Sequence, residues 1–322
     1  MKTSEYFCEL CHTPPSILVG VGSDFEYGTS QDSFSYALCP SCNHMFLANR
    51  PDRTQLKELY PPTYYTINPR SPIFLKGFTY HKKIKMDISR ISKFILDINA
   101  KSILEIGCGD CCRLIQLKRK LNIPGLQVTG VDLQITRDIL EKTGRENIRM
   151  IEGDIESLAT LSSAGTSYDA ILMSQLIEHL FDPRKILQFL FTLLNPNGMI
   201  LIETPNWQCL DFWLFKNRHW GGYHFPRHFN VFSPDSLAQL LQSCGFRIKK
   251  QGFLPSPGFW ISSLRNFLGL NSKAYSNSLF EFINLSSLPI VATFTLFDML
   301  RMSFKGKTST QYVVAIKPLA SS

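Results

Sequence analysis

Short apolar runs, each closed by a polar residue or a glycine, recur along the chain from about residue 100 onward. Such runs are typical of buried strands in an open parallel sheet, where ligands bind beyond the carboxyl ends of the strands. Two more apolar segments, 246–253 and 310–317, predict a closing pair of strands, and residues 234–244 predict a helix. The main strands are predicted at 103–106, 127–133, 148–155, 168–174 and 199–202.

The polar residues that end these strands are the first candidates for a binding site. Parallel strands end at the same edge of a sheet, so their terminal side chains would converge on one crevice. The residues in these positions are Glu105, Asp132, Asp154, Ser174 and Gln175.

The first strand runs directly into the turn Gly107-Cys108-Gly109. Glycines in such a turn let the backbone approach a ligand closely. A dinucleotide site would carry a third glycine where Cys112 stands, and Asp110 adds negative charge that disfavours a pyrophosphate. The turn therefore favours a cofactor with no phosphate and a cationic centre, which describes S-adenosylmethionine.

Taken together, these features resemble a class I S-adenosylmethionine-dependent methyltransferase. The resemblance covers residues 101–205 and rests on the glycine turn, on Asp132, and on the segments 153–155, 168–173, 177–183 and 194–202. It implies an α/β fold with a seven-stranded, mostly parallel, Rossmann-like sheet that ends in a hairpin. The family often has a third glycine or small residue where Cys111 stands in this chain.

The resemblance also implies a role for each strand-end residue. Glu105 and the backbone amides of the turn would hold the methionine part of the cofactor. Asp132 would bind the ribose, and Asp154 with the amide of Ile155 would bind the adenine. The full set of cofactor-binding residues implied in this way is Glu105, Gly107, Cys108, Gly109, Asp132, Leu133, Asp154, Ile155, Ser174 and Gln175.

Four cysteines near the N-terminus form two C-x-x-C pairs, Cys8 with Cys11 and Cys39 with Cys42. This spacing is typical of four thiolates that bind one zinc ion tetrahedrally, which leaves no open position and makes the metal structural. Two alternatives remain open. The pairs could be redox-active or unligated thiols, or a neighbouring histidine, His12 or His44, could replace one cysteine as a ligand.

A subset of class I methyltransferases, including sugar C-methyltransferases that act on nucleotide-linked deoxysugars, begins with such a zinc ribbon. This chain is similar to that group over most of residues 6–250, with Pro51, the segment 56–60 and the pair Tyr64-Tyr65 in the matching order. We expect a zinc ribbon over 1–50, a helical linker or lid over 51–95, and the methyltransferase domain over 96–322. An apolar helical insertion is expected at 255–308.

Residues 218–233 contain three histidines and many aromatic residues, and they show no regular periodicity. They predict a loop at the substrate side, where a histidine could remove the proton that methyl transfer releases. His228 is the first candidate for this base, His224 the second and His179, after the fourth strand, the third; a structural role is the alternative for each. In the sugar C-methyltransferases a glutamate precedes the histidine, whereas Arg227 stands here and would bind an anion or form a salt bridge.

The composition fits a soluble enzyme: among 322 residues, 19% are charged and 44% hydrophobic. The first residues lack the apolar core of an export signal, and nine cysteines fit a reducing cytoplasm. The apolar stretch 279–302 is interrupted by Pro289 and predicts two helices, not a membrane span. Those helices could pack on the sheet or on a second subunit, or they could contact the inner face of a membrane peripherally.

These observations predict a cytoplasmic methyltransferase that uses S-adenosylmethionine and a structural Zn²⁺. We expect a small or lipid-linked acceptor, a sugar above all; the net charge of +8 suits such an anionic substrate but does not single it out. One alternative is an RNA-modifying enzyme, which Ser174-Gln175-Leu176 disfavours because base methyltransferases stack a flipped base with a different motif there. The other is an inactive methyltransferase fold that serves as a binding protein.

Overall fold

The structure is a computed structural model, and it describes residues 3–5, 7–14, 17–61, 78–153, 166–270 and 282–319. Four residues singled out in the sequence, Tyr64, Tyr65, Asp154 and Ile155, lie outside this described part.

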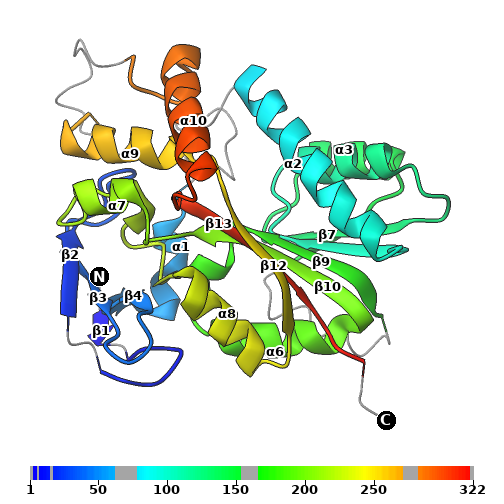
Figure 1. Ribbon diagram of the computed structural model, residues 1–322, viewed down its shortest axis with the longest axis horizontal. Helices are drawn as coiled ribbons and strands as arrows, with labels where there is room; N and C mark the ends of the chain where they lie inside the picture. The colour runs from blue at the N-terminus through cyan, green and yellow to red at the C-terminus, as the bar shows by residue number, and fades with distance from the viewer. Residues whose placement is uncertain are drawn as a thin grey trace.

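A seven-stranded sheet forms the centre of the molecule (Figure 1), in the order β12-β13-β10-β9-β6-β7-β8. Strands β10, β9, β6, β7 and β8 pair in parallel, and β13 is antiparallel to both of its neighbours. The predicted α/β fold with a mostly parallel seven-stranded sheet is thereby confirmed. The strands span Ser102–Ile106 (β6), Gln127–Asp132 (β7), Arg149–Glu152 (β8), Tyr168–Ser174 (β9), Leu194–Pro205 (β10), Arg247–Leu254 (β12) and Thr310–Ile316 (β13).

Helices cover both faces of this sheet, because the central strands are apolar on both sides (Figure 1). Helices α2 (Phe78–Asp97) and α3 (Cys112–Leu121) pack on one face, and α6 (Pro183–Leu193) and α8 (Pro234–Ser243) pack on the other. Local signals fix where the second pair begins: Asp182 caps α6, Ser233 caps α8, and a proline follows each cap. Helix α4 (Arg137–Arg145) lies beside β8 at the sheet edge.

The N-terminal region forms a four-stranded antiparallel sheet in the order β11-β4-β3-β2. Its strands β2 (Ile17–Gly22), β3 (Phe34–Leu38) and β4 (Met45–Leu47) come from the N-terminus, but β11 (Asn230–Val231) comes from the segment just before α8. This sheet is therefore completed by a strand that lies about 180 residues further along the chain. Shorter elements flank it: β1 (Thr3–Glu5), β5 (Asn49–Pro51), η1 (Arg53–Gln55) and α1 (Leu56–Leu59).

In the described part of the chain between β12 and β13 lie the helices α9 (Pro257–Phe267) and α10 (Leu288–Ser303). They share a small apolar core. Trp260 of α9 also stacks on Phe294 of α10, with 5.4 Å between the ring centroids. Helix α9 also packs on α7 (Leu210–Phe215) and η3 (Gly221–Tyr223). None of the described helices is long and apolar enough to cross a membrane.

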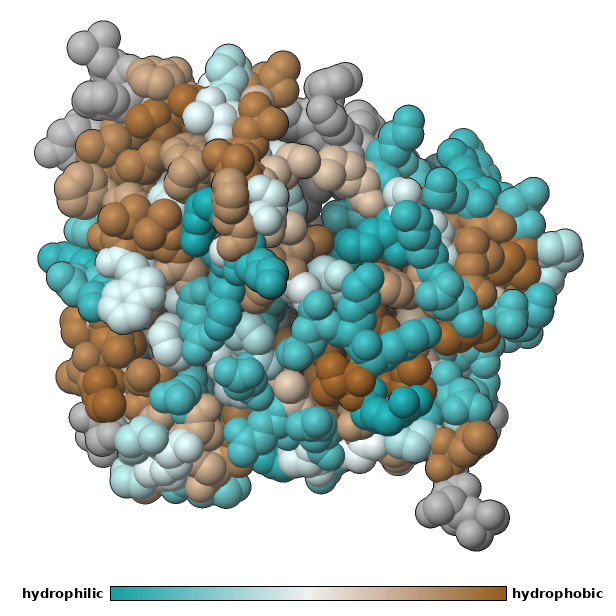
Figure 2. Space-filling view, viewed as in Figure 1, coloured by the Kyte–Doolittle hydropathy of each residue, from teal (hydrophilic) through white to brown (hydrophobic). Residues whose placement is uncertain are grey.

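Several large apolar side chains of this helical region are exposed, and they gather at the upper left of Figure 2. Isolated exposed apolar residues are common on protein surfaces, but a cluster of this kind marks a contact surface. The side chains that are at least half exposed are Trp213, Leu214, Phe267, Phe282, Leu288, Leu296, Leu300 and Phe304.

Two buried arginines tie the N-terminal sheet to the rest of the molecule. Arg227 is fully buried and donates hydrogen bonds of 3.0 and 2.8 Å to the carboxylate of Asp24. Arg50, also fully buried, donates to Glu9 and to the carbonyl oxygen of Phe181, at 3.0 and 3.1 Å. Arg227 therefore forms the salt bridge that was one of its two predicted roles. Although burial alone would raise the pKa of Asp24, the hydrogen bonds and charge of Arg227 lower it to about 2.

We predict that Asp24→Ala lowers the free energy of unfolding by about 3–5 kcal/mol, because it leaves the Arg227 charge buried without a partner. Since the folded-state pKa of Asp24 lies below its ordinary value of 3.8, this contribution is complete at neutral pH and is lost as the pH falls toward about 2. Urea unfolding of both proteins measures the difference. The exposed Asp97→Ala serves as control and should change the free energy of unfolding by less than about 0.5 kcal/mol. Equal stabilities of Asp24→Ala and Asp97→Ala would contradict the prediction.

Candidate active site

The register of the parallel strands brings the predicted strand-end residues to one edge of the sheet. Ile106 pairs with Val131 on β7 and with Met173 on β9. The next residues, Gly107, Asp132 and Ser174, therefore leave the sheet at the same level. Leu176 lies against the turn, because a Cβ atom built on Gly107 would come within 3.3 Å of its side chain.

The glycine turn is held in a conformation that favours glycine. Gly107 and Gly109 have φ angles of 72° and 56°, in the left-handed region, and Cys111 at the start of α3 has φ of 58°. No atom lies within 4 Å of a Cβ built on Gly109, so this part of the turn borders open space. The Cys108 side chain is buried in the core beneath α3, so only its backbone faces the edge.

Asp132 stabilises the turn directly, since the amide of Gly109 donates a 2.7 Å hydrogen bond to its Oδ2. Burial raises the pKa of Asp132 above its ordinary value, and the hydrogen bonds from the backbone amides around it reduce this rise. The adjacent Leu133 side chain is 68% exposed, so it extends from the edge of the sheet into solvent. These positions leave the carboxylate of Asp132 at the turn, where the resemblance places the ribose.

Beneath the turn lies a network of four charged side chains, most of which the sequence did not indicate. Glu105 accepts hydrogen bonds from Nη2 and, at 2.9 Å, from Nε of Arg113, and Nη1 of Arg113 donates to Glu203 at 3.2 Å. Arg90 of α2 forms an ion pair with the same Glu203, and Ser174 donates to it at 2.5 Å. Burial tends to raise the pKa of Glu203, but Arg113 and Arg90 lower it to about 2.

Two buried polar atoms of this network have no hydrogen-bond partner: Oε2 of Glu105 and Nη1 of Arg90. One is an acceptor and the other a cationic donor, so the pair matches an ammonium and a carboxylate on a ligand. Glu203 follows the fifth predicted strand, and the rule applied to the other strand ends would have found it. Arg90 and Arg113 lie on helices with no comparable signal.

The three predicted histidines come together in the structure. The ring centroids of His179 and His228 are 4.7 Å apart, and those of His224 and His228 are 4.9 Å apart. His179 ends the 3₁₀ helix η2 (Ile177–His179) that follows β9. His224 and His228 lie in the segment between η3 and β11. His179 thus forms one cluster with two histidines that lie 45 and 49 positions further along the chain.

Each histidine makes a specific hydrogen bond through Nδ1. His179 and His228 contact the carbonyl oxygens of Arg227 and Gly222, at 3.0 and 2.9 Å, and Tyr60 also lies 3.2 Å from His179. His224 contacts the carboxylate of Glu26, from the N-terminal region, at 2.8 Å. Burial lowers the pKa of His179 to about 3, and it lowers the pKa of His228 well below its ordinary value.

Next to these rings lies Glu178, a fully buried carboxylate whose pKa burial raises to about 8. Its Oε2 accepts a 2.8 Å hydrogen bond from Thr204, and its Oε1 has no partner. Glu26 and Glu178 were not among the predicted site residues. The 198 positions between Glu26 and His224 hide that contact from any local pattern.

The four predicted metal-binding cysteines lie together, and none of them forms a disulfide. Their sulfur atoms approach to 3.5 Å (Cys8 to Cys42), 3.3 Å (Cys11 to Cys39) and 3.7 Å (Cys11 to Cys42). A tetrahedral zinc ion bound at about 2.3 Å separates its sulfur ligands by about 3.8 Å, so the group fits zinc closely. His44 instead contacts Asn230 at 3.1 Å, and neither His44 nor His12 belongs to the group.

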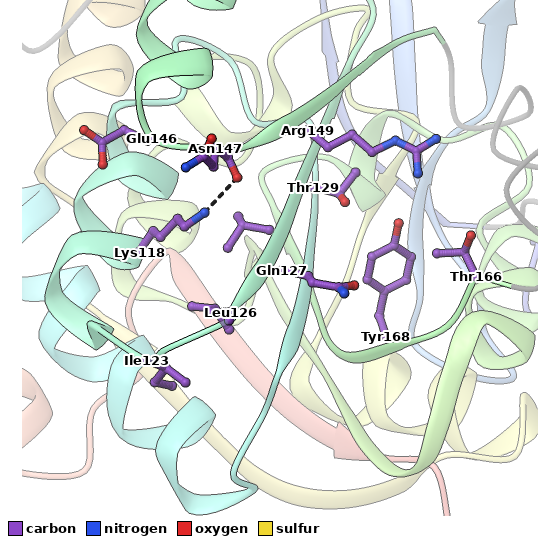
Figure 3. Close-up of a pocket in the computed structure, with 12 residues that line it drawn as sticks. Lys118, Ile123, Leu126, Gln127, Thr129, Glu146, Asn147, Arg149, Thr166 and Tyr168 are labelled. Atoms are coloured by element: carbon purple, nitrogen blue, oxygen red, sulfur yellow. Dashed lines mark hydrogen bonds between the residues drawn. The ribbon is translucent and has the colours of Figure 1, made fainter.

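A cavity of about 510 Å³ lies at the opposite edge of the sheet (Figure 3). Its lining includes Gln127, Arg149 and Tyr168, which stand at or near the beginnings of β7, β8 and β9. A hydrogen bond of 2.7 Å from Lys118 to the carbonyl oxygen of Asn147 crosses one side of it. The lining contains none of the predicted site residues, and ligands of open parallel sheets bind at the other edge. We therefore place the functional site at the carboxyl ends of the strands and not in this cavity.

Curated relatives match part of the chain. A ubiquinone biosynthesis O-methyltransferase of Dinoroseobacter shibae is 30% identical over 173 residues, which are 48% of this chain and 64% of that protein. The mitochondrial ubiquinone biosynthesis O-methyltransferase of Arabidopsis thaliana is 25% identical over 231 residues, 66% of each chain. The chain thus spans just under two thirds of the length of these relatives.

Solved structures agree on the fold. The 1,6-didemethyltoxoflavin-N1-methyltransferase of Burkholderia thailandensis, solved with 1,6-didemethyltoxoflavin and S-adenosylhomocysteine, covers 91% of this chain and 98% of its own, with a TM-score of 0.51 and 14% identity. At that identity the likeness concerns the fold alone. A family model described as a methyltransferase domain matches residues 79–251, more than half of the chain. The chain therefore belongs to the methyltransferase-domain family, within the class I S-adenosylmethionine-dependent methyltransferases.

Proposed function

We propose that this protein transfers the methyl group of S-adenosylmethionine to a hydroxyl group of a small acceptor, specifically a sugar. The observation that carries the proposal is the meeting of the glycine turn, Asp132 and the orphaned atoms of Glu105 and Arg90 at one sheet edge, with the histidine cluster beside them. When bound, the cofactor supplies a methyl group on a cationic sulfur, which is reactive without further activation.

The residues present fit this cofactor. The unpartnered oxygen of Glu105 would accept from its ammonium group, and the unpartnered nitrogen of Arg90 would donate to its carboxylate. Asp132 would bind the ribose hydroxyls, and the open side of Gly109 would let the backbone approach the methionine part. Ser174 and Gln175 line the same edge, and the adenine contacts proposed for Asp154 and Ile155 fall outside the described residues.

Among the histidines, His224 is best placed to act as the base. A base works best when its pKa lies near the working pH, and burial moves the pKa of His179 and His228 far below it. Glu26 orients His224 through Nδ1, as a carboxylate orients the histidine of a nucleophile–base pair. In the proposed step the hydroxyl proton passes to His224, the oxygen bonds to the methyl carbon, and the carbon–sulfur bond breaks with its electrons remaining on sulfur.

Two features support a sugar as the acceptor. The order of ribbon, Pro51, Tyr60 and histidine loop resembles the sugar C-methyltransferases, and Tyr60, Glu26 and the histidines offer several hydrogen-bond partners to a molecule rich in hydroxyls. Arg227 stands where that group has a glutamate, and its guanidinium is paired with the carboxylate of Asp24. The absence of that glutamate favours oxygen over carbon as the accepting atom. The names of the curated relatives place them in small-molecule biosynthesis, which gives no support to an RNA substrate or to an inactive binding protein.

We predict that the protein binds S-adenosylmethionine and transfers its labelled methyl group to a nucleotide-linked sugar. Asp132→Ala should weaken cofactor binding by at least about tenfold, because a charged hydrogen-bonding group is lost. Isothermal titration and transfer of labelled methyl measure the two effects. The control is Asp138→Ala, whose exposed carboxylate pairs only with Lys142 in the described contacts.

Failure to bind the cofactor would overturn the proposed function. Transfer to catechols or other phenols, with none to sugars, would keep the methyltransferase activity and overturn the sugar acceptor.

We also propose that the four cysteines bind one structural zinc ion. A closed set of four thiolates stabilises a small, loop-rich region that has little core of its own, so loss of the ion should unfold the neighbouring loops. Among the described residues, the buried apolar cluster at this site consists of Cys8 and Cys39 together with Ala37, Phe46 and Ala48.

We predict that a thiol-specific mercurial releases about one zinc ion per chain from the wild type and much less from Cys39→Ser. The variant should also melt at a lower temperature. Cys244→Ala removes a buried cysteine outside the group and should release as much zinc as the wild type. Zinc release that is the same in Cys39→Ser would refute the assignment.

Finally, we propose that the exposed apolar residues of α10 and α7 contact a membrane peripherally at the cytoplasmic face, which would bring the enzyme to a lipid-linked acceptor. Lys216, Lys305 and Lys307 lie in or next to this region and would face anionic lipid.

We predict that the wild type sediments with anionic vesicles more than with zwitterionic ones, and that the double variant Leu300→Asp, Phe304→Asp loses this binding. Both side chains are largely exposed, at 58% and 79%, so the folded state should tolerate the change. Leu140→Asp, at a 51% exposed position on α4, should bind vesicles like the wild type. Equal sedimentation with both vesicle types, or none, would argue against membrane contact.

A further inference from the structure

A second group of potential metal ligands lies on the acceptor side of the site, formed by Glu178, His179 and His228. A carboxylate oxygen and one nitrogen from each ring lie within 4.8 Å of one another. Glu178 is fully buried and His228 is 6% exposed, so bulk water does not surround these atoms. Within the described ranges, only this group and the four cysteines bring three or more such ligands together.

The hydrogen bonds of the two histidines fix which nitrogen is available. A carbonyl oxygen can only accept, so the contacts with Arg227 and Gly222 favour the tautomer of His179 and of His228 that carries its proton on Nδ1. The hydroxyl of Tyr60 lies 3.2 Å from the same nitrogen of His179. In that tautomer Nε2 of each ring holds a lone pair. Histidines that bind metals are oriented in this way, with the second nitrogen donating to a backbone carbonyl or a carboxylate.

Glu178 supplies the negative charge that such a site needs. One of its oxygens is held by Thr204, and the other is buried without a partner. No described arginine or lysine forms a salt bridge with it. This unpartnered oxygen belongs to the residue whose carboxylate lies within 4.8 Å of one nitrogen from each of the two rings, which is the kind of donor set that binds a cation.

We propose that Glu178, His179 and His228 bind a divalent transition-metal ion beside the acceptor. Two imidazole nitrogens and one carboxylate oxygen suit ions such as Zn²⁺, Co²⁺ or Fe²⁺ better than Mg²⁺ or Ca²⁺, which prefer oxygen ligands alone. Three protein ligands leave positions open for an acceptor oxygen, in contrast to the closed group of four cysteines.

Such an ion would give His179 and His228 a role other than that of a base. Its charge would lower the pKa of an acceptor hydroxyl placed next to it, so that His224 could take the proton at neutral pH. This part of the inference rests on the proposed methyl transfer, whereas binding of the ion does not.

The test uses full-length protein with zinc already bound, titrated with Co²⁺ and followed by calorimetry and visible absorption. We expect one further equivalent of Co²⁺, with weak visible bands and without the intense near-ultraviolet absorption of thiolate ligands. Glu178→Gln and His179→Gln should each weaken this binding by at least about tenfold. Both replacements keep hydrogen-bonding side chains of similar length, and circular dichroism with thermal melting verifies that the variants fold.

His219→Gln is the matched control, because this histidine lies on the same segment of chain but outside the group. It should bind Co²⁺ like the wild type. Absence of the further equivalent, or binding that persists in folded Glu178→Gln and His179→Gln, would overturn the inference.

Methyl transfer separates the two proposals. If Co²⁺ binds but no acceptor is methylated, the ion site stands and the proposed function fails. If methylation proceeds at the same rate with and without the ion and no binding is seen, the function stands and the ion site fails. Methylation that rises along the same saturation curve as Co²⁺ binding supports both.

Discussion

The arrangement of the candidate site depends on how the segment from Gly222 to Val231 is held between the N-terminal sheet and the helix η2 that follows β9. Its backbone joins the N-terminal sheet through β11, and the amide of Phe229 donates a 2.7 Å hydrogen bond to the carbonyl oxygen of Glu178 in the methyltransferase part. The buried ion pair between Arg227 and Asp24 adds a second contact between this segment and the N-terminal region. Since the N-terminal sheet and the helix η2 that follows β9 both bind this one segment, its histidines keep a defined position beside the carboxyl ends of the parallel strands.

Local patterns were sufficient for the parts of the site that lie at strand ends. Apolar runs predicted β6, β7 and β9, and the geometry of parallel sheets then placed Gly107, Asp132 and Ser174 at one level, as the register shows. The spacing of the cysteines predicted a cluster for a similar reason, because each pair is a short local turn and only the meeting of the two pairs requires the fold. The strand boundaries themselves shifted: the third strand is Arg149–Glu152, shorter than the predicted 148–155.

Contacts between distant segments could not be predicted in the same way. Glu26 lies in a loop of the N-terminal sheet, and no periodicity connects it with His224. Arg90 and Arg113 are ordinary basic residues of amphipathic helices until packing turns them toward Glu203 and Glu105. Strand β11 has only two residues, too few for any hydrophobic pattern, yet it is the strand that completes the N-terminal sheet.

The site therefore consists of two regions that differ in their charged groups. At the cofactor side, two arginines balance two glutamates, and one unpaired atom of each sign remains for a zwitterionic ligand. At the acceptor side, a carboxylate oxygen of Glu178 and one ring nitrogen each of His179 and His228 lie within 4.8 Å of one another. Methyl transfer removes a proton from the acceptor while the positive charge on sulfur disappears. A region that gathers acceptors is suited to receiving positive charge, whether as a proton on His224 or as a bound ion, and the balanced network next to it can remain unchanged through the reaction.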